Sequence, residues 1–202
     1  RKEELKESAE QKREELKGRI EEAREKAKEE LEARRAEFKE KLGSVRDEQK
    51  KKIAERIDEQ LNELNERLMK HFSDVLDRLG KVLVNIESRT DKAEAKGWDV
   101  SNVRTMIQSA EKAINEARTA VEAQSGKTYT PQITGDEGKL KTDVGQTRQT
   151  LHGDLAAVKE KIRLAFEAVR RVATTLATVP RVDDEEENEI SSSPTASPNP
   201  TP

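Results

Sequence analysis

The amino-acid sequence predicts an all-α protein. A long, highly charged N-terminal helix runs into an antiparallel three-helix bundle, and a disordered acidic and Ser/Thr/Pro-rich tail follows. Charged residues make up 40% of the 202 residues and aromatic residues only 2%. Acidic and basic residues nearly cancel to a net charge of −3, whereas a disordered chain combines low hydrophobicity with a large net charge. Apolar residues also recur in steps of four, four and three, which is the spacing of one helix face.

The apolar residues of the first half follow an eleven-residue repeat. Eleven residues over three turns correspond to about 3.67 residues per turn, slightly more than in a straight helix, so the apolar stripe drifts slowly around the helix. We therefore expect one helix from about residue 3 to residue 96, with its continuity at Gly43 left open. The residues at the first position of the repeat are Ala9, Ile20, Leu31, Leu42, Ile53, Leu64, Val75 and Ile86.

Residues 1–52 differ from the rest of this helix in their high charge. Pairs such as Glu22 and Lys26 place opposite charges four residues apart, and each pair stabilises a helix by only ~0.2–0.5 kcal/mol. Because the apolar stripe is thin here, we expect a projecting arm ~75 Å long, either a single helix or a coiled-coil strand. From residue 53 the stripe thickens, so residues 53–96 are expected to form the first helix of the bundle.

The second and third helices of the bundle are expected at residues 99–125 and 136–178. Gly97 suits the left-handed residue that ends a helix. Asp99 suits the N-cap of the next helix, with Trp98 placed before it to form a hydrophobic staple. The two helices on either side of Gly97 are therefore expected to form a hairpin.

A loop is expected at residues 126–135, with a short extended piece around Thr128. Thr134 and Glu137 have the spacing of a capping box for the helix that follows. Pro180 ends that helix, because proline cannot continue one.

Apolar residues are expected to hold the bundle helices together. They lie on one face of each predicted helix, so they can meet in a common core. The predicted packing set is Ile53, Leu64, Leu68, Phe72, Leu79 and Ile86 against Ile107, Ile114, Leu155, Ile162 and Phe166.

Residues 180–202 contain the acidic run "DDEEENE" and the tract "SSSPTASPNPTP", neither of which can bury a core.

The chain contains no cysteine, so neither a disulfide nor a thiolate metal site is predicted. No apolar run approaches the ~18 residues of a membrane span. The first residue is Arg1 rather than Met, so we expect that an upstream segment, such as a signal peptide, has been removed.

Arginines recur at one position of the eleven-residue repeat. A functional interpretation is a row of cations for an anionic partner, such as lipid head groups or a phosphate-rich polymer. A structural interpretation lays each arginine stem over the apolar stripe and pairs its charge with an acid, as Glu63 can with Arg67. The structural interpretation needs no partner and is preferred. The arginines are Arg56, Arg67, Arg78 and Arg89.

A second candidate interaction surface is the thin apolar stripe of the arm. It would form a sparse dimer seam, or it would bind a protein partner. Charge pairs alone would also support a solitary helix, so the sequence leaves this choice open. The stripe residues are Leu16, Ile20, Leu31, Phe38 and Leu42.

No residue pattern predicts catalysis, a cofactor or a metal ion. His71 and His152 are the only histidines, and their spacing is not that of a zinc site. The segment "GDEGKLKT" fails the phosphate-loop pattern, because only two residues separate its glycines and Leu140 follows the lysine. Nucleic-acid binding is not expected either, since the net charge is negative and the short basic runs have no aromatic residues among them.

Two long runs carry a resemblance to other proteins: "RLGKVLVNIESRTDKAEAKGWDVSNVRTMIQSAEKAINEARTAV" and "TDVGQTRQTLHGDLAAVKEKIRLAFEAVR". They resemble a group of uncharacterised, predicted exported helical proteins of uncultured small-genome bacteria, over about residues 42 to 180. In such proteins a signal peptide precedes the helices and a Ser/Thr/Pro tract follows. The resemblance implies an exported or envelope-associated protein, and otherwise a cytoplasmic location is expected.

The sequence therefore predicts a non-enzymatic spacer, scaffold or protein-interaction module that works through its helical arm. The alternative is peripheral binding to a lipid surface through the same arm. Its eleven-residue repeats resemble, in periodicity only, those of exchangeable apolipoproteins and of some desiccation-protective helical proteins. The narrow apolar stripe of the arm argues against this alternative, because interfacial helices carry a broad apolar face.

Overall fold

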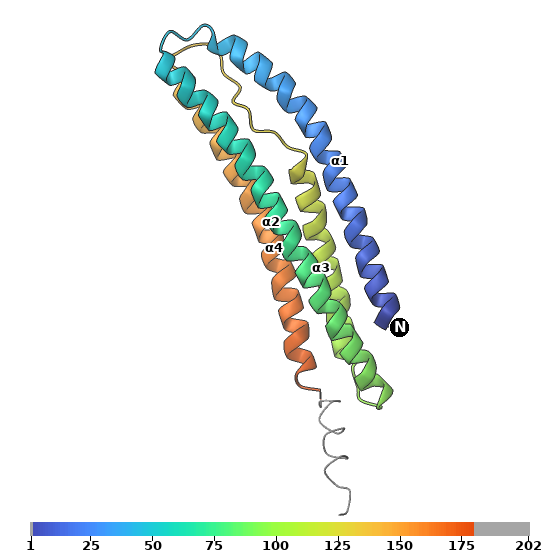
Figure 1. Ribbon diagram of the computed structural model, residues 1–202. Coiled ribbons are helices and arrows are strands. Elements are labelled where there is room, and N and C mark those ends of the chain that lie inside the picture. Colours follow the sequence, from blue (N-terminus) through green and yellow to red (C-terminus); the bar gives the residue numbers. More distant parts are fainter. Residues whose placement is uncertain (1, 180–202) are drawn as a thin grey trace, which may run out of the picture.

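The computed structural model describes residues 2–179 as four α-helices that lie side by side in one elongated bundle (Figure 1). The helices are α1 (Lys2–Leu42), α2 (Glu48–Ala95), α3 (Ser101–Ser125) and α4 (Leu140–Leu176). No strand occurs within this range, and the predicted all-α class is confirmed. The tail that the sequence predicts to be disordered, residues 180–202, lies outside the described residues.

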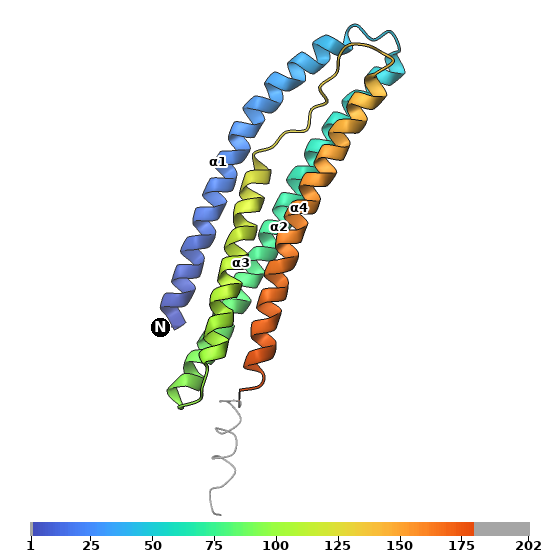
Figure 2. The same cartoon turned by 180° about the vertical axis from the view of Figure 1, so that it is seen from behind.

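The helices alternate in direction along the chain. α1 and α3 run toward the end of the bundle that holds the α1–α2 turn, and α2 and α4 run away from it (Figure 1, Figure 2). α2, α3 and α4 pack against one another, which confirms the antiparallel bundle. The backbone of α1 lies against α2 and α3 and not against α4 in the described structure, and only side chains near the α1–α2 turn join α1 to the start of α4. α1 is therefore a fourth helix laid over the α2/α3 junction.

The predicted helix from residue 3 to residue 96 is interrupted after Leu42. The backbone N–H of Gly43 donates to the carbonyls of Lys39 and Glu40, at 3.1 and 3.0 Å, and closes the last turn of α1. Asp47 then caps α2, because its Oδ1 accepts the backbone N–H of Gln49 at 2.9 Å. The chain reverses between these two helix ends. Residues 2–52 are therefore not the projecting arm that the sequence predicts.

Burial of its apolar stripe explains why α1 folds back. A free arm would leave this stripe in water, whereas the reversal removes it from water at ~25 cal/mol per Å² of apolar surface. Leu16 and Ile20 enter the main core cluster that α2, α3 and α4 share. A second cluster surrounds the α1–α2 turn and contains Phe38, Leu42, Val45, Ala54, Ile133, Leu140 and Val144.

The predicted packing set is correct in most positions and wrong in two. Ile53 is 59% exposed and Phe166 is 55% exposed. An eleven-residue step turns a straight helix ~20° beyond three full turns, so Ile53 lies ~60° around α2 from the buried Ile86. Ala54 takes the core position instead. The set includes the buried residues Leu79, Ile86, Ile107, Ile114 and Ile162 and the partly buried Leu64, Leu68, Phe72 and Leu155.

The α2–α3 hairpin forms as the sequence predicts, with a shifted cap. Gly97 has a φ of 85°, the left-handed conformation that glycine adopts without strain. The backbone N–H of Trp98 donates to the Ala93 carbonyl at 3.1 Å and that of Gly97 to the Glu94 carbonyl at 2.9 Å, the two bonds of a Schellman motif. Asp99 accepts the backbone N–H of Ser101 at 3.0 Å, and α3 begins there.

α3 is shorter than the other helices, and the segment from residue 126 to residue 139 occupies the place beside α2 and α4 that a longer α3 would fill. α3 ends near the middle of the bundle, and the segment continues between α1 and the α2/α4 pair to the start of α4 (Figure 1, Figure 2). The predicted capping box of Thr134 and Glu137 does not form, since the Glu137 carboxylate accepts from Lys50 Nζ at 2.7 Å and from the Arg46 backbone N–H at 3.2 Å. α4 consequently begins at Leu140 rather than at residue 136.

Candidate functional site

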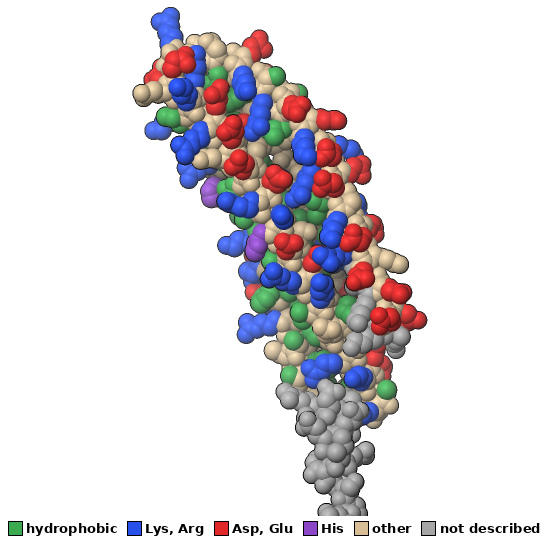
Figure 3. Space-filling model, viewed as in Figure 1, with side chains coloured by type: hydrophobic (Ala, Val, Ile, Leu, Met, Phe, Trp, Pro, Cys, Tyr) green, Lys and Arg blue, Asp and Glu red, His purple; other side chains and the backbone are tan. Residues whose placement is uncertain are grey.

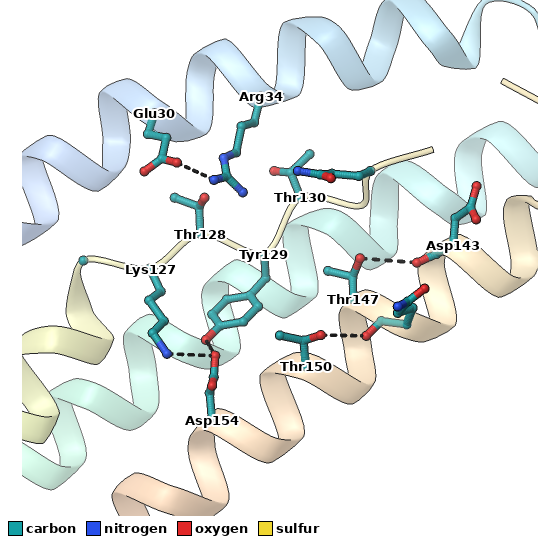
Figure 4. Close-up of a pocket in the computed structure, with 13 residues that line it drawn as sticks. Glu30, Arg34, Lys127, Thr128, Tyr129, Thr130, Asp143, Thr147, Thr150 and Asp154 are labelled. Atoms are coloured by element: carbon teal, nitrogen blue, oxygen red, sulfur yellow. Dashed lines mark hydrogen bonds and ion pairs between the residues drawn. The ribbon is translucent and has the colours of Figure 1, made fainter. Parts of the chain in front are cut away.

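A polar groove of about 570 Å³ lies where α1, the 126–139 segment and α4 come together (Figure 4). These three elements form its walls. The chain between α3 and α4 is extended and therefore narrower than a helix, which leaves a hollow beside it. The lining residues include Glu30, Arg34, Lys127, Thr128, Tyr129, Thr130, Asp143, Thr147, Thr150 and Asp154.

Tyr129, the only tyrosine of the chain, lies at the inner wall of this groove. Its ring packs in a buried cluster with Leu61 of α2 and Leu151 of α4. Its hydroxyl donates to Asp154 Oδ2 at 2.6 Å and accepts from Gln124 Nε2 at 2.5 Å. Its backbone N–H donates to Asn62 Oδ1 at 2.9 Å. One residue therefore fastens the segment to α2, α3 and α4.

Buried amide side chains extend this contact into the α2/α3 junction. Gln124 Nε2 also donates to Asn65 Oδ1, at 2.9 Å. Asn65 Nδ2 in turn donates to the backbone carbonyls of Gln124 and Lys127, at 3.2 and 3.3 Å. Buried polar groups of this kind cost folding free energy unless they are paired, and here each is paired.

The same network reaches α1 through a buried carboxylate. Asn62 Nδ2 donates to the Asp58 carbonyl at 2.9 Å, and Arg35 Nε of α1 donates to Asp58 Oδ2 at 2.7 Å. We call this set the Tyr129 network. Its members are Arg35, Asp58, Asn62, Asn65, Gln124, Lys127, Tyr129 and Asp154.

Two members of the Tyr129 network have shifted pKa values. Burial, with the hydrogen bond to Asp154, raises the pKa of the Tyr129 phenol. Burial also acts to raise the pKa of Asp154, but hydrogen bonds from Tyr129 and Lys127 outweigh it and leave that pKa below its ordinary value. Lys127 Nζ lies 3.0 Å from Asp154 Oδ2, and Figure 4 shows Lys127 and Tyr129 both directed at Asp154. Both pKa values thus move away from neutrality, whereas a general acid or base needs one near the operating pH.

Two threonine hydroxyls beside the groove are shielded from solvent and lack partners within the described structure. The Oγ1 atoms of Thr128 and Thr130 are buried and have no hydrogen-bond partner among the described residues. The nearby charges are already engaged: Arg34 pairs with Glu30, and the Asp143 carboxylate accepts the Thr134 backbone N–H at 3.2 Å. The charged groups that line the groove are therefore occupied within the protein, which does not favour chemistry there.

A second polar cluster joins α1, α2 and α3. Arg13 Nε donates to Asp77 Oδ2 at 2.5 Å. Arg118 of α3 is only 8% exposed, and its Nε has no hydrogen-bond partner in the described structure. Burial lowers the pKa of Arg118, and the charge of Asp77 partly opposes this effect. Gly80 leaves room for this side chain, since a Cβ there would lie 3.3 Å from Arg118 Nη2.

The predicted arginine row is exposed and unpaired. Arg56, Arg67, Arg78 and Arg89 are all exposed on α2. None of the four has an ion pair or hydrogen bond from its side chain to any residue that the structure describes. The predicted pairing of Glu63 with Arg67 is therefore absent, and the structural interpretation of the row loses its main support.

The predicted interaction stripe of the arm is not available as a surface. Leu16, Ile20, Phe38 and Leu42 are buried within the bundle, and Leu31 is partly buried. The prediction of an interface through these residues is wrong for the folded chain, because α1 turns back and packs them against α2, α3 and the α4 start.

The two histidines do not form a site. His71 and His152 are both exposed, and His71 lies beside the Phe72 ring with 5.9 Å between ring centroids. The described residues contain no group of three or more His, Asp or Glu side chains that could hold a metal ion. Across the same residues, no helix is long and apolar enough to cross a membrane.

The Tyr129 network was not predicted, although the sequence carries a signal for half of it. Ala54, Asp58, Leu61 and Asn65 follow a four-three-four spacing, and all four are buried on one face of α2. Two polar residues thus stand at core positions of an apolar pattern. Such residues require partners, and the pattern does not say which residues provide them.

The comparisons with known proteins found no relative. No protein-family model matches the chain, and no curated protein and no solved structure matches it.

Proposed function

We propose that the chain is a non-enzymatic structural module, a rigid helical spacer or scaffold that holds interacting partners apart. The observation that carries this proposal is α2, a single helix of 48 residues. At ~1.5 Å per residue it is ~72 Å long. α1, α3 and α4 all pack against it, so the bundle stiffens it on several sides.

The Tyr129 network supports the same proposal. The 126–139 segment is the longest connection between helices in the described bundle. Along it, no other described helix packs beside α1, α2 and α4. Tyr129, Asn62 and Asn65 fasten this segment to α2, and Asp154 fastens it to α4. A rod with such a gap would bend there, and the hydrogen bonds oppose that bending.

The chemistry of the groove supports a role without catalysis. Its carboxylates are engaged with cations, hydroxyls or backbone N–H groups, and the pKa values of Tyr129 and Asp154 lie away from neutrality in opposite directions. A protein partner would bind the outer faces of the bundle, since the apolar stripe of α1 is occupied. An exported or envelope-associated location, implied by the resemblance stated above, is part of this proposal.

Distance measurements between paired spin labels test the rigidity on which the proposal depends. The chain contains no cysteine, so labels attach only to introduced ones. Lys52→Cys with Asn85→Cys spans ~50 Å of α2, and Glu32→Cys with Ala157→Cys joins α1 to α4. All four positions are exposed. A spacer gives one narrow distance distribution for each pair; broad or multiple distributions contradict it.

A further inference from the structure

A seam of exposed apolar side chains follows the outer junction of α2 and α4. Ile53 and Phe166 are more than half exposed, and Val82 is 44% exposed. Leu64, Leu68 and Val75 are partly buried along the same line of α2. Large apolar side chains that remain in water along one line are more informative than isolated ones.

Helix geometry places these residues beside the same junction. Val75 and Val82 are seven residues apart, and Leu155 and Phe166 are eleven apart, so each pair lies within ~20° on its helix. Leu64 of α2 and Leu155 of α4 pack against one shared buried cluster. The seam therefore borders the α2/α4 junction, and α1 covers the other side of α2.

Unpaired cations flank the seam on both helices. Arg67, Arg78 and Arg89 follow one another at eleven-residue intervals on α2, and Arg148, Lys159 and Arg170 do the same on α4. All six are exposed, and within the described chain none of these side chains forms an ion pair or hydrogen bond. Lys159 follows Leu155 by four residues and Arg170 follows Phe166 by four, ~40° around the helix.

Several cations of α1 show the opposite arrangement. Lys26, Lys28 and Lys41 each pair with a glutamate of the same helix, within 2.7 Å. Figure 3 shows Lys and Arg side chains with hydrophobic ones between them along the α2/α4 edge, while Asp and Glu are numerous along the α1 edge. Both helices beside the apolar seam thus carry rows of cations without ion pairs in the described structure.

We propose that the α2/α4 seam is a peripheral membrane contact. It binds the anionic head groups of phospholipids through both rows of cations and inserts Val82 and Phe166 into the acyl boundary. Apolar side chains flanked by Lys and Arg are the combination that holds helices at an anionic bilayer surface.

Sparse apolar contacts favour a lipid surface over an acidic protein. Cations at eleven-residue intervals are ~16.5 Å apart along each helix. A protein partner would need acids at matching intervals and apolar side chains that fill the gaps between Ile53, Val82 and Phe166. A fluid lipid surface adapts to any spacing. A phosphate polymer would use the cations and leave the apolar side chains in water.

The α2/α4 seam differs from the helical arm through which the sequence analysis considers lipid binding, and it includes the α2 arginine row for which lipid head groups were one interpretation. The apolar stripe of the arm is not exposed, because its Leu16 and Ile20 are buried in the core. The α2/α4 seam remains exposed in the folded bundle, so binding requires no opening of the fold. The inference does not rest on the spacer role, since a flexible bundle would present the same seam.

Flotation of the full chain with vesicles tests the head-group contact. We expect it to float with vesicles of phosphatidylcholine and phosphatidylglycerol in equal parts, to float much less with phosphatidylcholine alone, and to be released by salt. Arg78→Gln with Lys159→Gln removes one cation from each row. At about fivefold for each cation, affinity falls about 25-fold. The control pair, Lys39→Gln with Lys112→Gln, removes the same charge from exposed lysines of α1 and α3 whose side chains form no ion pair or hydrogen bond with the described residues, and it leaves flotation nearly unchanged.

Equal losses in the two pairs overturn the proposal, because they show attraction by net charge alone. Absence of flotation with the anionic vesicles also overturns it. If the chain is then retained on immobilised polyglutamate and the seam pair loses that retention, an acidic polypeptide is the occupant instead.

A single tryptophan tests insertion of the apolar side chains. Trp98→Phe removes the only tryptophan, and Phe166→Trp then places one in the seam. Brominated lipids in the anionic vesicles should quench this tryptophan strongly. Leu164→Trp is the matched control, since Leu164 is exposed on the same helix ~160° away. Equal quenching at the two positions, or none at residue 166, overturns the insertion of Phe166.

Discussion

Two helix interfaces within this bundle differ in the kinds of side chains that hold them together. The interface among α2, α3 and α4 has an apolar centre, where Leu76, Ala110, Val121 and Val172 are completely removed from solvent. Its ion pairs, such as Arg104 with Asp91 and Lys161 with Glu116, keep both side chains partly in water. The interface of α1 with α2 and α3 depends more on ion pairs between helices, and two of these pairs bury their carboxylate, that of Asp58 or Asp77. Arg13 pairs with Asp77, Arg19 with Glu122 and Arg35 with Asp58.

The difference shows how a highly charged helix is added to a bundle to whose core it contributes few residues, among them Leu16 and Ile20. Small residues fill much of the three-helix core, since Ala110 and Ala117 of α3 are completely buried there. α1 contributes a few large apolar residues at wide intervals. Between them, its arginines pair with acidic residues of α2 and α3. Because local stability follows buried apolar contacts, we expect α1 to open more readily than the other helices.

The largest effect should follow from a cavity in the apolar interface. Leu76→Ala removes a fully buried side chain at the centre of the core. It should lower the free energy of unfolding by about 2–5 kcal/mol, as measured by urea denaturation. Ile53→Ala is the control on the same helix, and its effect should be far smaller because Ile53 is mostly exposed. Similar losses from the two substitutions would contradict the placement of the core.

A smaller and more local effect should follow from removing one cross-helix ion pair. Asp58→Asn leaves the Arg35 guanidinium beside a neutral amide, and it should cost about 1–3 kcal/mol. Hydrogen exchange should increase in the second half of α1 and remain nearly unchanged in α3. Uniform exchange throughout the bundle would show that α1 is no weaker than the core and would remove the distinction between the two interfaces.

Periodicity predicted most of the fold because it reports which residues of a helix are apolar. It predicted the all-α class, the α2–α3 hairpin at Gly97 and most of the packing residues. It did not predict the return of α1, since a stripe such as Leu16, Ile20 and Leu31 looks the same whether its partner is another chain or the next helix. Gly43 marked the place of the turn, but one glycine does not determine whether a helix breaks.

The polar contacts were less predictable, because they depend on register between helices. The sequence predicts the row of exposed arginines on α2, and the expected pairing of Arg67 with Glu63 within the helix is wrong. The Tyr129 network combines residues from four separate parts of the chain. Nothing local relates Arg35 to Asp58 or Tyr129 to Asp154, so only the assembled structure brings them together.

A pH dependence should appear where the two kinds of interface meet, at Tyr129. The pKa of the phenol is raised in the folded protein, so its contribution to stability is complete below pH ~10, the ordinary tyrosine value, and is lost as the pH rises above it. Tyrosinate absorbance of this single tyrosine should therefore appear at higher pH in the folded chain than in urea. Tyr129→Phe should lose ~1 kcal/mol at neutral pH and depend less on pH above that value. Coincident absorbance titrations in buffer and urea would show that the phenol is not held by Asp154.

The smallest effect should come from an ion pair that does not leave α1. Lys26 Nζ lies 2.7 Å from Glu22, a geometry as close as that of Arg35 with Asp58, yet both side chains of the first pair are mostly exposed. Solvent screens such a pair, and neither side chain reaches another helix. Lys26→Gln should therefore leave the urea midpoint unchanged within error, whereas Arg35→Gln should lower it. If the two substitutions lowered the midpoint equally, the intrinsic helicity of α1 would limit its stability, and the contacts across the interface would not be what holds it in place.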